Sequence, residues 1–145
     1  MEGCETMNAK EYLSQVQSKE RQVKKQEDYI ARLKETLDVA GVRYDKEVVQ
    51  SSPEPDQMLQ ILSKLEEQEK ILDTMKMELL EFKLSIIEKI NQLDKRLYRE
   101  ILYYRYLENG NLKSFAETRS YSCSYAKKLH RKALYLFEQK FLKNT

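Results

Sequence analysis

Four cations lie within six consecutive positions near the C-terminal end of the chain. They are Lys127, Lys128, Arg131 and Lys132. Ammonium and guanidinium groups gathered in this way can contact successive phosphates of a nucleic acid, and each contact releases condensed counterions. Long donors such as Lys128 and Arg131 can also reach guanine edges in the major groove. The cluster therefore predicts a polyanion-binding surface, while charge alone is equally compatible with a solvated helix face.

A helix is needed to present this cluster, and the apolar pattern predicts one from about Ser122, a candidate N-cap, to about Lys143. Its expected buried face consists of Ala126, Leu129, Ala133, Leu136, Phe137 and Phe141. The opposite face carries Ser124, Lys128, Arg131 and Tyr135, flanked by Lys127 and Lys132. The spacing i, i+4, i+7, i+11 makes this one polar stripe.

A short helix over Leu112–Arg119 and a tight break at residues 119–122 precede the basic helix. Two helices joined in this way form a helix-turn-helix, in which the second helix enters the DNA groove. A further helix over Asp94–Leu107, ended by Asn109-Gly110-Asn111, completes the expected module. Its tyrosines at 103, 104 and 106 could stack on single-stranded bases. Their helical spacing favours packing in the core instead.

The N-terminal part of the chain predicts two long helices that pair as an antiparallel hairpin or coiled coil. The first runs from Asn8 to Ala40, with Val16, Val23, Ile30 and Leu37 at seven-residue spacing and the polar Lys19 and Gln26 on the second seam. The other runs from about Pro55 to Leu93, with Gln68 and Lys89 interrupting its second seam. Its first seam is apolar throughout: Met58, Leu65, Leu72, Leu79, Ile86 and Leu93. Two narrow stripes bury little surface, so we expect further self-association.

The expected organisation is therefore all-α with two domains. Residues 1–93 form the oligomerising hairpin, with a connector at 41–55 that contains Pro53 and Pro55. Residues 94–145 form the helix-turn-helix module. Charge follows the same division, because residues 91–145 hold 12 Lys and Arg against 5 Asp and Glu, a net of +7, which leaves −5 for residues 1–90. This segregation favours a polyanion as the partner of the C-terminal part.

Catalytic and metal-binding constellations are weak. His130 is the only histidine, so neither a Ser-His-Asp triad nor a His-based metal cluster can be assembled within one chain; we expect it to pack beside Leu129 or to contact phosphate. Three glycines provide no phosphate-cradling loop. Cys4 and Cys123 form no CxxC pair, which argues against a disulfide framework or a zinc site. We predict no enzyme activity, no cofactor and no metal.

The module also carries a resemblance to a known family. Leu112, Phe115-Ala116, Ser120-Tyr121-Ser122, Ala126, Leu129 and Lys132-Ala133-Leu134 resemble region 4 of bacterial sigma-70-type factors, whose final helix-turn-helix reads the promoter −35 element. The chain is also similar to Gram-positive phage proteins related to the RinA and ArpU late-gene regulators. That likeness extends to "MNAKEYL" at Met7–Leu13 and "VVQSSPEPD" at Val48–Asp56.

The resemblance implies positions for DNA contacts. Base-reading places fall on Cys123, Ser124 and Lys128, and backbone-contacting places on Tyr125, Lys127, Arg131 and Lys132. Three features depart from the sigma pattern. Ser120 stands at a turn position that is often Gly, Arg119 stands where an apolar residue usually packs, and Cys123 and Ser124 replace long charged side chains. We therefore expect a target other than the −35 sequence, or weaker readout supplemented by oligomer avidity.

The function that the resemblance implies is that of a phage or prophage transcriptional regulator. It would bind double-stranded DNA, contact RNA polymerase, and activate late genes for packaging and morphogenesis. We expect a homo-oligomer, a dimer or higher, in the cytoplasm of a bacterial host and associated with the nucleoid, with no membrane contact. Two alternatives stay open: a DNA-packaging component like a small terminase subunit, and an adaptor of host polymerase or sigma factor that never touches DNA. In the former the DNA-binding module usually comes first, the reverse of this chain.

Overall fold

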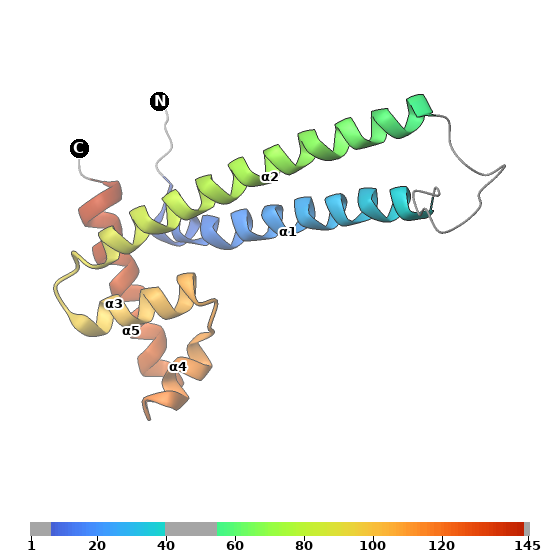
Figure 1. The fold of residues 1–145 in the computed structure, drawn as a ribbon. Coiled ribbons are helices and arrows are strands. Elements are labelled where there is room, and N and C mark those ends of the chain that lie inside the picture. Colours follow the sequence, from blue (N-terminus) through green and yellow to red (C-terminus); the bar gives the residue numbers. More distant parts are fainter. Residues whose placement is uncertain (1–6, 40–54, 144–145) are drawn as a thin grey trace. The chain divides into compact units, whose positions relative to one another are not determined.

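The computed structural model describes residues 7–39 and 55–143, and every regular element among them is a helix (Figure 1). The elements in chain order are α1 (Ala9–Val39), α2 (Pro55–Ile90), α3 (Arg96–Leu102), the π-helical turn η1 (Tyr103–Leu107), α4 (Leu112–Thr118), α5 (Cys123–Phe137) and the π-helical turn η2 (Glu138–Leu142). The predicted all-α class and the long N-terminal helix pair are confirmed. Of the predicted connector, residues 41–55, only Pro55 lies within the described residues, where it begins α2 as expected.

By packing, the described residues form two compact units. The first unit contains the chain up to Lys19 together with the chain from Leu79 onward, and the second unit contains Glu20–Glu78. Both long helices therefore contribute to both units. The predicted domains, residues 1–93 and 94–145, divide the chain by expected function, and that division stays a prediction.

A reciprocal cap defines the start of α1. The Asn8 side chain accepts a hydrogen bond from the Glu11 backbone N–H at 2.8 Å, and the Asn8 N–H donates to the Glu11 carboxylate at 3.3 Å. This capping box satisfies two N–H groups that the first turn would otherwise leave without partners. Asn8 is thus the N-cap that the sequence predicted.

In the second unit, α1 and α2 lie side by side and antiparallel. Ile30 and Leu37, at the predicted seven-residue spacing, are buried there. The two glutamines that interrupted the apolar seams meet, because the Gln26 side-chain amide donates to the Gln68 side-chain oxygen at 2.8 Å and to its backbone oxygen at 3.0 Å. A polar pair of this kind fixes the register of two helices at some cost in stability.

The first unit encloses the main hydrophobic core. It is built from the start of α1, the end of α2 and the C-terminal helices. Its largest fully buried side chains are Tyr106, Phe115, Phe137, Leu13, Ile86, Ile90, Ile101, Leu102 and Val16. The polar seam residue Lys89 donates to the Tyr12 hydroxyl at 3.0 Å, and Lys19 lies over the Phe82 ring at 5.2 Å. The seam interruptions of the sequence therefore have partners here as well.

The connection from α2 to α3 differs from the prediction of a helix to Leu93 and a new helix from Asp94. The α2 helix ends at Ile90, and residues 91–95 form a turn that brings Leu93 into the core, where it is 4% exposed. Arg99 holds this turn by donating to the backbone oxygens of Leu93 at 2.6 Å and Asp94 at 3.2 Å. The heptad pattern predicted that the helix continues to Leu93. The chain instead leaves the helix after Ile90, and the turn buries Leu93 in the core.

The expected single helix over residues 94–107 also has a different ending. Its second half is the π-helical turn η1, and Asn109 follows with a φ of 62°. Gly110 donates its N–H to the Tyr104 carbonyl at 2.9 Å and lies so close to the Tyr104 ring that a Cβ would collide with it. A side chain at this position would displace the Tyr104 ring, so glycine allows the close approach.

Candidate nucleic-acid interface

The turn between α4 and α5 sets the direction of the basic helix. At the end of α4 the Tyr121 N–H donates to the Ala116 carbonyl at 2.8 Å and the Ser120 N–H donates to the Glu117 carbonyl at 3.3 Å. Ser120 has a φ of 59°. This hydrogen-bond pair with a left-handed residue is the Schellman motif, which usually has glycine at that position. The sequence indicated the position correctly, and serine occupies it with backbone strain.

Both helices of the pair have capped N-termini. The Asn111 side chain accepts a hydrogen bond from the Ser114 N–H at 2.8 Å at the start of α4. The Ser122 hydroxyl accepts one from the Tyr125 N–H at 3.1 Å at the start of α5. Ser122 is therefore the N-cap that the sequence predicted. The four-residue break and the two caps together give α4 and α5 the local form of a helix-turn-helix.

Packing confirms the buried face predicted for α5. Ala126, Leu129, Ala133 and Phe137 are at most 7% exposed, and Leu136 and Phe141 are partly buried against the same core. Because this face fixes the rotation of the helix about its axis, the stripe opposite to it must face outward.

All seven predicted contact residues are exposed. They are Cys123, Ser124, Tyr125, Lys127, Lys128, Arg131 and Lys132. The Tyr125 side chain is 45% exposed and meets the edge of the Tyr121 ring at 5.1 Å between centroids. Tyr135, at the far end of the stripe, is 56% exposed. The fold therefore brings the seven together on the accessible surface of one helix, while their role in binding stays a prediction.

We call Lys127, Lys128, Arg131 and Lys132 the basic ridge. The α5 helix contains these four cations and no Asp or Glu. Within residues 7–39 and 55–143, no carboxylate forms an ion pair with any of the four. The Lys132 ammonium lies over the Tyr135 ring, 6.0 Å from its centroid. A helix face with this much unneutralised charge attracts polyanions.

His130 does not belong to the basic ridge. Its Nε2 shares a hydrogen bond with the buried Tyr106 hydroxyl at 2.9 Å, and the two rings stack at 5.6 Å between centroids. Burial, and then the positive charges of Arg105, Lys10 and Arg131, lower the pKa of His130 to about 4. The imidazole is therefore neutral near pH 7 and attaches α5 to η1. Tyr106 is thus a packing partner of His130, and the alternative phosphate contact stays a prediction.

The three tyrosines of η1 divide between core and surface. Tyr106 is 1% exposed, and burial raises the pKa of its phenol. Tyr104 is partly buried and packs against Phe115 at 5.7 Å between ring centroids. Tyr103 is 37% exposed, so the expectation that all three pack in the core is wrong for this residue. The π-helical turn rotates the chain relative to an α-helix, which sequence spacing could not reveal.

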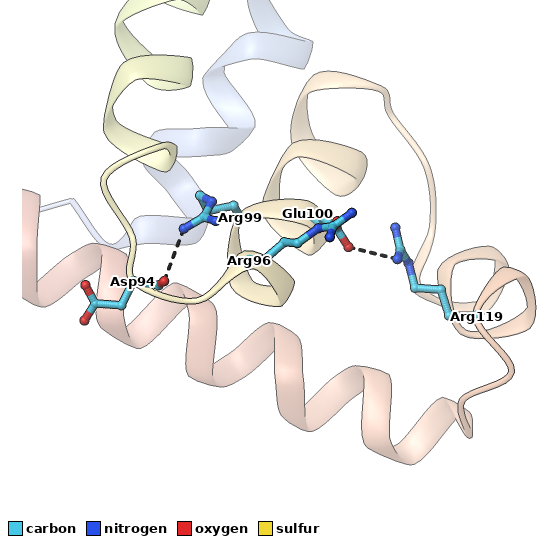
Figure 2. Close-up of polar contacts among 5 residues, drawn as sticks. All are labelled: Asp94, Arg96, Arg99, Glu100 and Arg119. Carbon is cyan, nitrogen blue, oxygen red and sulfur yellow. Dashed lines mark hydrogen bonds and ion pairs between the residues drawn. The ribbon is translucent and has the colours of Figure 1, made fainter.

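Arg119 lies at a position where the resemblance stated from the sequence predicted an apolar residue. Its guanidinium lies over the Phe115 ring, 4.6 Å from the centroid, and Nη1 contacts Glu100 Oε1 at 2.8 Å. The flat guanidinium thus packs on Phe115 of the core, and its charge pairs with Glu100 of α3. Figure 2 shows Glu100 between Arg96 and Arg119. Sequence spacing gave no signal for this contact, because residues 100 and 119 belong to different helices.

Comparison with known proteins gives no further information on the interface. No family model, no curated protein and no solved structure matches the chain. In the part of the chain that the structure describes, no group of acidic, His and Cys side chains could hold a metal ion, and no helix is long and apolar enough to cross a membrane.

Proposed function

We propose that this protein is a transcriptional regulator of the phage or prophage type that binds double-stranded DNA through the α4–α5 helix-turn-helix. The observation that carries the proposal is the basic ridge, whose four exposed cations have no carboxylate partner among the described residues. The packed face of α5 fixes its rotation, and the Ser122 cap fixes where it begins. The α5 helix has 15 residues, hence a length of about 22 Å. A helix of this size fits the major groove.

The residues have distinct expected roles in this proposal. Ser124 and Lys128 lie on the stripe opposite the core and read base edges, together with Cys123 at the helix start. Lys127, Arg131 and Lys132 contact phosphates, and the exposed Tyr125 hydroxyl donates to another. Phosphate contacts supply affinity and register, whereas base contacts supply discrimination. The regulator then activates late genes by contacting RNA polymerase.

Self-association through the long helices is the second part of the proposal. Besides the residues buried between α1 and α2, the α2 helix has large apolar side chains on its surface. In the second unit Leu59 is 64% exposed and Met77 is 57% exposed, and in the first unit Leu80 and Leu84 are each 51% exposed. Exposed leucines on a long helix favour a further helix as partner. Two or more DNA-binding modules in one particle increase the avidity for paired sites.

Two single substitutions separate base reading from phosphate contact. We expect Lys128→Ala to reduce the preference for a selected duplex over a scrambled duplex by about 1–3 kcal/mol, because a bidentate base contact is lost. Lys132→Ala should weaken binding to both duplexes alike. Fluorescence anisotropy with a duplex selected from a random pool measures both effects, and Lys64→Ala on the exposed surface of α2 is the charge-matched control. Equal losses for both duplexes with Lys128→Ala would remove the assigned base contact.

A further inference from the structure

A cavity of about 440 Å³ lies in the first unit beside α3 and η1, next to the end of α4. Three arginines and two glutamates line it: Arg96, Arg99, Arg119, Glu100 and Glu108. Cavities of this size commonly hold small molecules or a few side chains of a bound peptide. Among the described residues none from α5 lines it, so the cavity is a surface separate from the basic ridge.

Two of the arginines share one carboxylate. Arg96 Nε contacts Glu100 Oε2 at 2.7 Å and Arg119 Nη1 contacts Glu100 Oε1 at 2.8 Å (Figure 2). Each contact uses one of the five N–H donors of a guanidinium. The Arg96 side chain is 82% exposed and that of Arg119 is 36% exposed. Both therefore keep donors that can bind a further carboxylate, and Glu100 holds the two guanidiniums in place for it.

Aromatic side chains form another part of the lining. Tyr103 is 37% exposed, and Tyr104 is partly buried against Phe115. An apolar side chain of a bound partner would be removed from water beside these rings. A carboxylate next to it in the partner could then bind Arg96 or Arg119. The combination of an arginine pair and exposed aromatic surface is typical of protein interaction sites.

We infer that this cavity binds an acidic peptide segment of a partner protein, in which a carboxylate lies next to an apolar side chain. A nucleic acid fits the same lining poorly, because Glu100 and Glu108 add two negative charges among the three arginines. The basic ridge, by contrast, lies on a helix without any acidic residue. The inference rests on the proposed function in one respect only: in a regulator, this surface is where the transcription machinery would be contacted.

The probe for the test is a fluorescein-labelled, end-capped peptide in which glutamate alternates with leucine. A peptide with glutamine in place of glutamate is the control. Anisotropy titration gives the affinity for the full-length protein, and the chemical shifts of backbone amides and arginine Nε–H groups locate the site. We expect the acidic peptide to bind saturably and the glutamine peptide not to bind. The acidic peptide should change the chemical shifts of Arg96, Arg119 and Tyr103. Absence of binding, or shifts confined to α5, overturns the inference.

Charge changes around the cavity give effects of opposite sign. Arg96→Gln changes a highly exposed side chain and should lower the affinity for the peptide at least about tenfold, because hydrogen bonds to a charged group are lost. Glu108→Gln should strengthen binding about twofold to threefold by removing a like charge at the exposed edge of the site. Lys113→Gln, at an exposed position of α4 that does not line the cavity, changes charge equally and should have no effect. Equal affinities for all three variants would contradict the cavity assignment.

One further variant separates this inference from the proposed function. Lys128→Gln on the basic ridge should leave the peptide affinity unchanged and weaken DNA binding, and duplex DNA should not displace the peptide. If the peptide binds the cavity but no variant of the ridge affects DNA binding, the proposed function fails and the peptide site stands. If DNA displaces the peptide, the two ligands share one basic surface and the inference fails.

Discussion

The helix pair of the second unit and the helix α5 are both rich in charge, but their charges have different neighbours. In the second unit Lys34 lies 3.5 Å from Glu69 and Lys76 lies 3.4 Å from Glu27, so cations of one helix meet carboxylates of the other. On α5 the four cations have no such partners among the described residues. Exposed ion pairs contribute little stability, yet they cancel the local field. Unpaired cations leave a field that a polyanion can neutralise.

The largest expected effect comes from removing the ridge charge. The combined variant with Gln at positions 127, 128, 131 and 132 should lower DNA affinity at least about a hundredfold. The slope of log K against log salt should become shallower by about 0.9 for each of the three cations assigned to phosphates. Lys34→Gln with Lys76→Gln should change neither quantity, since their charges are already paired. If the two variants had similar slopes of log K against log salt, the distinction between unpaired cations on α5 and paired cations in the helix pair would be wrong.

The next effect concerns the polar pair within the helix hairpin. Gln68→Leu removes the side-chain acceptor of the part-buried Gln26 amide and leaves it only the backbone oxygen of residue 68, so the free energy of unfolding should fall by about 0.5–1.5 kcal/mol. Replacement of both glutamines by leucine should recover that loss and reduce the uniqueness of the helix register. Urea unfolding measures the first effect, and broadening of the backbone amide signals of α1 and α2 in NMR spectra measures the second. Gln60→Leu on the exposed surface of α2 is the control; a loss as large there would show that the pair has no special role.

A pH-dependent effect follows from the neutral His130. Because its pKa is lowered to about 4 in the folded protein from about 6.5 in the unfolded chain, the unfolded state binds the proton first as the pH falls. The contribution of His130 is therefore fully present above about pH 6.5 and is lost progressively toward pH 4. His130→Gln should unfold with a weaker pH dependence across this window in a series of urea titrations. Identical pH profiles for the two proteins would contradict the lowered pKa.

The smallest expected effect is at the turn before α5. Ser120→Gly should raise the free energy of unfolding by up to about 1 kcal/mol, because glycine adopts the positive φ of 59° without the clash of a Cβ. Ser122→Ala, two residues on, should instead lower it by about 1 kcal/mol through loss of the N-cap. Thermal unfolding should show shifts of opposite sign. The same sign for both would mean that the turn is not the one described.

Local rules predicted much of the fold. The caps at Asn8 and Ser122, the helix start at Pro55 and the buried face of α5 depend on residues within a few positions of each other. Periodicity also found Ile30 and Leu37 in the hairpin seam. The ends of α2 and α3 were placed less well, because burial of Leu93 and of Tyr106 in a common core decides them. Such burial depends on helices distant in sequence.

The sequence by itself determined that the chain is helical, where most helices begin, and which face of α5 is apolar, since hydrogen bonds and periodicity within single helices decide these features. Only the tertiary structure decided that Gln26 meets Gln68, that His130 stacks on Tyr106, and that Glu100 joins Arg96 to Arg119. The reason is physical. A contact between helices depends on the rotation and register of both, and these follow from the packing of the whole core.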